Sequence, residues 1–145
     1  MVLNAKRRKY YSAVEMWGPI LSVPGVTFVN LQYGEVTAEL DLVREKLGVT
    51  IRNFTDLNLR DDLDGAAALT NSCDLVISAP TAAAAMAGAL GKNVWFMVAG
   101  RVWPQLGTDH YPWYPASRVF ACETFADWDP LMLRVRDALS AFSRA

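Results

Sequence analysis

A run of small side chains between two apolar segments is the feature of this sequence that points most directly to chemistry. Pro80 and Thr81 are followed by four alanines, and the run lies between the apolar segments DLVISA and NVWFMV. With Pro80 at the first helical position, the N–H groups of Thr81, Ala82 and Ala83 would have no partner inside the helix. Such a helix start carries a partial positive charge and suits phosphate oxygens.

The same run also has a purely structural explanation. Small side chains let a helix pack closely on a sheet, and alanine is the best helix former. The sequence contains neither GxxxxGK[ST] nor GxGxxG, so those nucleotide-binding motifs do not support the phosphate hypothesis. Spacing alone therefore leaves both explanations open.

A long aromatic-rich segment, residues 99–117, holds two further candidates. His110 is the only histidine in the chain, and histidine is the usual general acid or base near neutral pH. No serine or cysteine nucleophile motif accompanies it. The alternatives to catalysis are that His110 contacts a bound substrate or has a structural role. The aromatic side chains, among them Trp103, could stack on a sugar or base, or could anchor the loop or cover a contact surface.

Composition limits the class of protein. The chain has 145 residues, of which 52% are hydrophobic and 20% charged, which fits one globular domain. A formal net charge of −1 gives no electrostatic reason to expect nucleic acid or an anionic membrane as partner. Cys73 and Cys122 are expected to be reduced thiols of a cytoplasmic protein, and no uninterrupted apolar stretch is long enough for membrane insertion.

Helix and strand patterns alternate along the chain. Strands are expected at 26–32, 49–54, 74–79, 93–98 and 118–122, and helices at 10–21, 35–48, 63–72, 80–91 and 127–142. This order predicts an α/β fold, a Rossmann-like three-layer sandwich with a mostly parallel sheet of about five strands and helices on both faces. Ligands bind such sheets in the loops after the strands.

Three segments carry a family resemblance: FVNLQYGE, DLVIS…TAAAAMAGALGKNVWF and DHYPWYPASRVF. Together they resemble the C-terminal lobe of GT-B-fold glycosyltransferases, in particular those fused to tetratricopeptide repeats and similar to lipopolysaccharide heptosyltransferases. The resemblance covers nearly the whole chain, from about residue 9 to the last helix. It implies a lobe that binds a nucleotide-diphosphate sugar, with inverting glycosyl transfer as the parent activity.

The resemblance also implies which residues contact the donor. The phosphate-binding residues would be Gln32, Tyr33, Gly34, Thr81, Ala82 and Ala83. The loop after the second strand would lie near the base, through Phe54 and Asp56. The loop after the fourth strand adds Trp103 and His110 as candidate contacts of the base or sugar.

Two positions depart from the family pattern. Relatives often have an acidic or small polar residue where this chain has Pro80, and a histidine where it has Ala85. The loss of both polar side chains removes donor contacts but leaves the backbone amides in place.

A GT-B enzyme also places its acceptor site, and often its catalytic base, in an N-terminal lobe, whereas residues 1–145 correspond to a single lobe. We therefore expect one domain that is incomplete as an enzyme by itself and whose catalytic residues are not identifiable. It would work with the missing lobe, a partner chain or a second copy. The alternative is a degenerate, non-catalytic GT-B-like module for binding or assembly.

No metal or other cofactor is expected. Asp62 and Asp64 match the DxD metal signature of the other large glycosyltransferase fold, GT-A. Here they open an expected helix, where carboxylates stabilise the helix dipole. The GT-B resemblance implies metal-independent transfer, with the nucleotide sugar as substrate.

Overall fold

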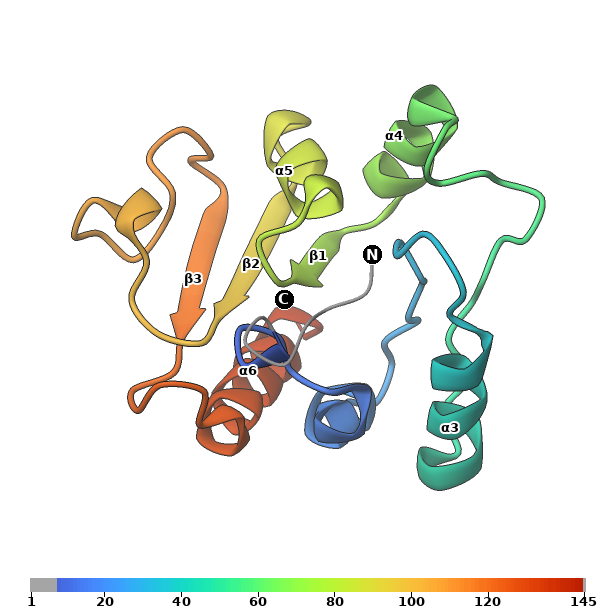
Figure 1. Ribbon diagram of the computed structural model, residues 1–145, viewed down its shortest axis with the longest axis horizontal. Coiled ribbons are helices and arrows are strands. Elements are labelled where there is room, and N and C mark those ends of the chain that lie inside the picture. The colour runs from blue at the N-terminus through green and yellow to red at the C-terminus, as the bar shows by residue number, and fades with distance from the viewer. Residues whose placement is uncertain (1–7, 145) are drawn as a thin grey trace.

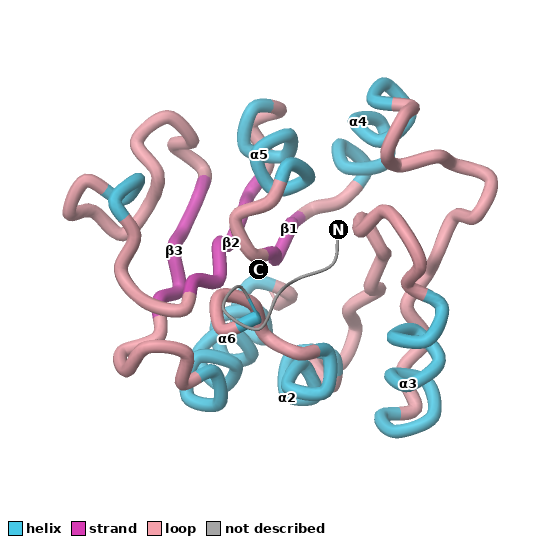
Figure 2. The backbone as a smooth tube through the Cα atoms, viewed as in Figure 1, coloured by secondary structure: helices cyan, strands magenta, loops and turns pink. Residues whose placement is uncertain are grey.

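The computed structural model describes residues 8–144. Helices come first in this part of the chain, and three strands separated by helices or loops follow in its second half (Figures 1 and 2). The elements are η1 (Val14–Trp17), α2 (Gly18–Leu21), α3 (Thr37–Leu47), α4 (Leu63–Ser72), β1 (Leu75–Ser78), α5 (Ala82–Ala89), β2 (Asn93–Val98), η2 (Trp103–Gln105), β3 (Ser117–Ala121) and α6 (Trp128–Phe142).

The three strands form a parallel sheet in the order β1-β2-β3. Helix α5 covers one face, and α6 with α2 covers the other (Figure 1). Side chains of β2 alternate between two apolar clusters: Trp95 and Met97 pack towards α6, while Val94 and Phe96 pack towards α5. This period of two is what a strand buried on both faces requires. The predicted α/β class, with a parallel sheet between helices, is confirmed.

The predicted number of strands is wrong, because the sheet has three strands rather than about five. Segments 26–32 and 49–54 meet only at one parallel bridge, between Val29 and Arg52. Its two hydrogen bonds run from Asn30 N–H to Arg52 O and from Arg52 N–H to Phe28 O, both at 2.8 Å. Val26 and Phe28 pack against the core, but Arg52 and the four residues after it are exposed. The second segment therefore lacks the half-buried surface that a sheet strand fits.

Most helices follow local sequence signals, and the largest departure is near the N-terminus of the described residues. Helix α3 ends at Gly48, which has the left-handed φ of +67° that the predicted stop requires. The expected single helix at 10–21 is instead a 3-10 helix followed by α2. Pro19 explains the break, because it has no N–H to continue a helical ladder. None of the helices within residues 8–144 is long and apolar enough to cross a membrane.

Candidate functional site

Helix α5 begins two residues later than predicted. Its N-cap is Thr81, whose side-chain oxygen accepts a hydrogen bond from Ala84 N–H, so the first helical residue is Ala82 rather than Pro80. Threonine is a strong N-cap, and it sets the helix start by satisfying one of the orphan donors. Among residues 8–144, the N–H groups of Ala82 and Ala83 have no hydrogen-bond acceptor.

The Thr81 hydroxyl is occupied within its own turn. Its oxygen lies 3.2 Å from Ser78 Oγ, and the Ser78 hydroxyl donates to the carbonyl oxygen of Ala79 at 2.8 Å. Because Ser78 has a single hydroxyl hydrogen, Thr81 is the donor between the two. A phosphate at this helix start would therefore meet two free amides, while the threonine proton is already engaged.

A second region, which we call the loop hollow, lies between the loops that follow segments 26–32 and 49–54. It has a volume of about 400 Å³. It is lined by Gln32, Tyr33 and Gly34 from the first loop and by residues including Phe54 and Arg60 from the second. Four of the residues expected to contact the donor are thus brought into one hollow.

Asn30 ties the two loops together. Its side-chain nitrogen donates to Asn53 Oδ1 at 2.9 Å and to Gln32 O at 3.0 Å. Its side-chain oxygen accepts from Gln32 N–H at 3.0 Å. Sequence reasoning missed Asn30, although an asparagine directly after an apolar segment is a known signal for a turn closed by its own side chain.

Two aromatic side chains are exposed at the loop hollow, one from each loop. Tyr33 is 52% exposed and Phe54 is 46% exposed, and both line the hollow. Gly34 next to Tyr33 has φ +101°, a conformation that favours glycine and turns the chain sharply here. An exposed ring beside polar amides can stack on a flat ligand such as a nucleobase.

The other expected donor residues lie outside the loop hollow. None of Thr81, Ala82 and Ala83 lines it, and Asp56 does not line it although its two neighbours do. In Figure 1 the chain rises through segment 26–32, whereas the arrows of β1, β2 and β3 point downward. The loop hollow does not include the start of α5, although Leu31 at the end of segment 26–32 packs against the apolar cluster that contains Ala84 and Ala87.

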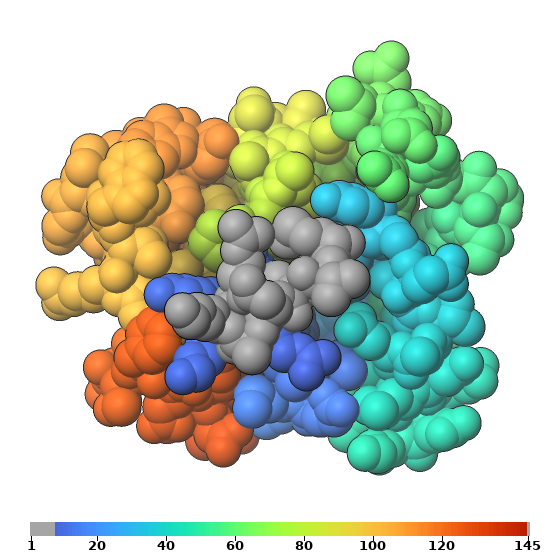
Figure 3. All heavy atoms as spheres, in the orientation of Figure 1, coloured from blue at the N-terminus to red at the C-terminus, as the bar shows by residue number. Residues whose placement is uncertain are grey.

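The aromatic loop, residues 99–116, is anchored at one end and open at the other. The ring of Tyr111 is buried and stacks on Phe96 with centroids 4.3 Å apart, and burial raises the pKa of the Tyr111 hydroxyl. Trp103 is 81% exposed, and its ring centroid lies 6.3 Å from that of Trp113. In the space-filling view this loop protrudes at the left edge of the molecule (Figure 3).

His110 pairs with its neighbour Asp109. The distance from His110 Nδ1 to Asp109 Oδ1 is 3.0 Å, and this hydrogen bond lowers the pKa of the Asp109 carboxyl. Both side chains are on the surface of the aromatic loop and outside the loop hollow. The contact with Asp109 orients the imidazole. That His110 contacts the nucleotide-sugar donor stays a prediction.

The acidic pair at the start of α4 has a structural role. Asp62 is the N-cap, and its Oδ1 accepts from Gly65 N–H at 2.8 Å, as predicted from carboxylates at a helix start. Within the described residues no group of three or more His, Cys, Asp or Glu side chains could hold a metal ion.

Comparison with known proteins adds a partial relative. The chain is 43% identical over 141 residues to Protein FlbA of Caulobacter vibrioides. The match covers 97% of this chain and 24% of that protein, so the chain spans about a quarter of the length of the curated relative it matches. No protein-family model matches the sequence, and no solved structure matches it either.

Proposed function

We propose that this chain is the nucleotide-diphosphate-sugar-binding lobe of a GT-B-type glycosyltransferase. The parent reaction would be inverting, metal-independent glycosyl transfer, and the chain would be incomplete as an enzyme by itself. The observation that supports this best is the loop hollow, which brings together Gln32, Tyr33, Gly34 and Phe54. These are four of the residues that the resemblance to GT-B lobes assigns to the donor.

In this proposal the two parts of the site hold different parts of the donor. The base stacks on Tyr33 or Phe54 in the loop hollow. The diphosphate accepts hydrogen bonds from the free amides of Ala82 and Ala83, which would stabilise the charge that develops on the leaving group. Leu31, just before the loop that carries Gly34, packs against the apolar cluster that contains Ala84 and Ala87 of α5, so the donor would extend from the loop hollow to the start of α5.

The acceptor and a catalytic base would come from elsewhere. We propose a second lobe, a partner chain or a second copy of this chain as their source. A cytoplasmic location fits two cysteines that form no disulfide, Cys73 and Cys122. Nucleic acid and membrane are not part of the proposal.

A specific observation favours the alternative function, a degenerate GT-B-like module for binding or assembly. The Thr81 hydroxyl is engaged with Ser78, and the helix start lies outside the loop hollow. A lobe that had lost donor binding would keep its fold and keep such internal contacts.

Thermal-shift titration against UDP, ADP, GDP and their sugar conjugates tests the proposal. A ligand present at about 100 times its Kd should stabilise the fold by roughly 2.7 kcal/mol. Phe54→Ala should weaken this shift because it removes an exposed ring of the loop hollow. Leu90→Ala is the matched control, since Leu90 is also exposed but does not line the hollow.

A pair of variants at the N-cap tests the phosphate part. Thr81→Asp should abolish the shift, because its carboxylate would repel a diphosphate, while the fold remains intact since aspartate is an equally good N-cap. Thr81→Ser keeps the cap without the charge and should keep the shift. No shift with any nucleotide would favour the degenerate module instead.

A further inference from the structure

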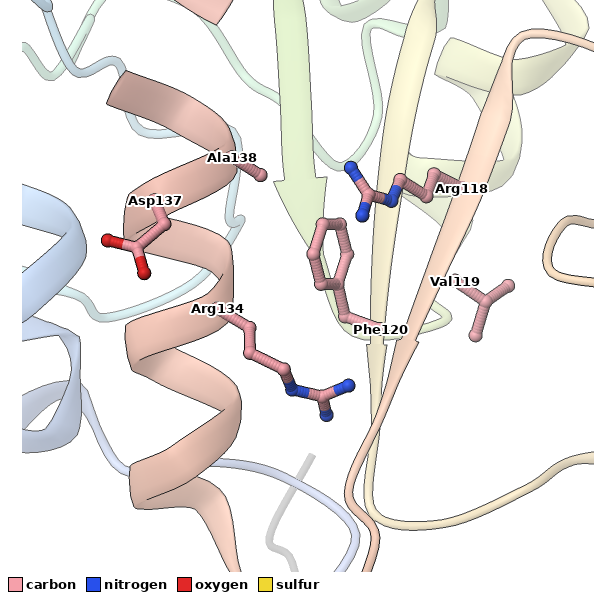
Figure 4. A pocket seen from close by; sticks show the side chains of 6 residues that line it. All are labelled: Arg118, Val119, Phe120, Arg134, Asp137 and Ala138. Atoms are coloured by element: carbon pink, nitrogen blue, oxygen red, sulfur yellow. The ribbon is translucent and has the colours of Figure 1, made fainter. Parts of the chain in front are cut away.

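A separate hollow of about 360 Å³ lies between the edge strand β3 and helix α6. We call it the β3–α6 hollow. It is lined by Arg118, Val119, Phe120, Arg134, Asp137 and Ala138 (Figure 4). It shares no residue with the loop hollow, so what it binds does not depend on the proposed function.

Arg118 occupies a position where the strand pattern calls for an apolar side chain. Alternation along β3 places it on the same face as Phe120 and Cys122, which pack in the cluster against α6. The Arg118 guanidinium carbon lies 4.4 Å from the centroid of the Phe120 ring, a cation–π contact that holds the group flat. Among residues 8–144 it forms no ion pair.

Arg134 reaches the same hollow from α6. One of its terminal nitrogens donates to the carbonyl oxygen of Ala121, which fixes the side chain and leaves its other donors free. It likewise has no carboxylate partner within the described part of the chain. Figure 4 shows Arg118 and Arg134 extending from different elements towards opposite sides of the Phe120 ring.

The carboxylate that lines the hollow, that of Asp137, is already paired. Asp137 Oδ1 accepts from Arg136 Nε at 2.9 Å and from a terminal nitrogen of Arg136 at 2.7 Å. Ala138 is too small to fill the space beside it, so the hollow stays open. The β3–α6 hollow therefore presents two guanidinium groups that form no ion pair within residues 8–144. Asp109 lies outside the hollow, and the pKa of its carboxyl is lowered mainly by the hydrogen bond with His110 and to a smaller extent by the charge of Arg118.

We propose that the β3–α6 hollow binds a small anion that carries two phosphate groups, one at Arg118 and one at Arg134. Guanidinium groups match phosphate oxygens through paired hydrogen bonds. Both arginines are held by neutral contacts, so binding costs little side-chain entropy. Two guanidinium groups that come from different elements and line one hollow offer one site for each of two linked anionic groups. The hollow is of the size that small-molecule sites occupy.

Titration with inorganic pyrophosphate, followed through backbone amide NMR shifts, tests this site. Saturable shifts are expected in β3 and α6, with orthophosphate binding more weakly because it carries only one phosphate. Arg118→Gln and Arg134→Gln should each raise the Kd by about tenfold or more. Asp137→Asn should lower the Kd, because it removes a negative charge from the hollow.

Two controls make the test decisive. Arg44→Gln should leave the Kd unchanged, since Arg44 pairs with Asp41 on α3. Thr81→Asp should also leave it unchanged, which separates this site from the proposed donor site. Arg118→Lys and Arg134→Lys keep the positive charge but lose the paired hydrogen bonds. Their Kd for pyrophosphate should therefore lie between that of the original chain and those of the glutamine variants.

Two results would overturn the proposal. One is the absence of saturable shifts in β3 and α6, or the same Kd in the glutamine variants as in the original chain. The other is self-association of Arg118→Gln with unchanged pyrophosphate binding. In that case Arg118 would serve only to keep the edge strand from pairing with other chains, as inward-pointing charges on edge strands do.

Discussion

At the scale of single residues, Gly88 marks a close approach between α5 and the aromatic loop. A Cβ atom built on Gly88 would lie 2.6 Å from Cγ of Tyr114 and 2.8 Å from its Cδ1 and Cδ2. The Tyr114 ring is in turn stacked with Phe96, with centroids 6.3 Å apart, so it cannot easily move away. The small residues of α5 thus have a packing function as well as any role in ligand binding.

We predict that Gly88→Ala lowers the free energy of unfolding by about 1–3 kcal/mol through overpacking. The loss should appear even though alanine favours a helix over glycine by about 1 kcal/mol. Urea unfolding measures it. Gly100→Ala is the control, because a Cβ there would meet only Phe125 Cδ2 at 3.5 Å, an ordinary contact. A Gly88→Ala variant as stable as the original chain would show that Tyr114 gives way.

Residue roles that depend on neighbours in sequence could be predicted, and those that depend on distant neighbours could not. Carboxylates before an apolar run identified Asp62 as part of a helix start, and it is the N-cap. The prediction from Pro80 placed the start of α5 two residues too early, because Thr81 rather than the residue before Pro80 is the N-cap. The bond from Asn30 to Asn53 joins residues far apart in the chain, and no local pattern announces it.

At the scale of elements, α6 shows most clearly how one helix supports the sheet. Leu131 on α6 is fully buried in the cluster that also contains Trp95 and Met97. Leu133, two positions later on the same helix, is 44% exposed. The two residues are thus both leucines on the same helix, and they differ in burial.

We expect Leu131→Ala to cost about 2–5 kcal/mol of unfolding free energy, because it leaves a cavity in the core. Leu133→Ala should change the stability by no more than about 0.5 kcal/mol. Chemical unfolding of the two variants side by side gives the comparison. Equal losses would mean that α6 does not pack on the sheet as described.

Most helices and the three strands of the sheet could be predicted from the sequence, whereas the failure of two further segments to join the sheet could not. The pattern of β2 and the capping signals of α3 and α4 are local, and the structure follows them. Segments 26–32 and 49–54 have strand-like composition, but the structure gives them one bridge. Strand propensity describes a fit to a half-buried surface, and whether a neighbouring strand provides that surface is a tertiary property.

At the scale of the whole molecule, the layer order was predictable and the assembly of the site was not. Alternating helix and strand patterns predict a parallel sheet with helices on both faces, and that is observed. The predicted donor site requires the loops after 26–32 and after β1 to meet. The loop hollow holds the first of these loops without the second.

In the proposed complex, one nucleotide-diphosphate sugar contacts both the loop hollow and the start of α5. Backbone amide NMR shifts of the chain, titrated with the sugar conjugates of UDP, ADP and GDP, test it most directly. We expect saturable shifts at Gly34, Phe54, Ala82 and Ala83 with a single Kd for one of these donors. Unshifted Ala82 and Ala83 amides with every donor would contradict it.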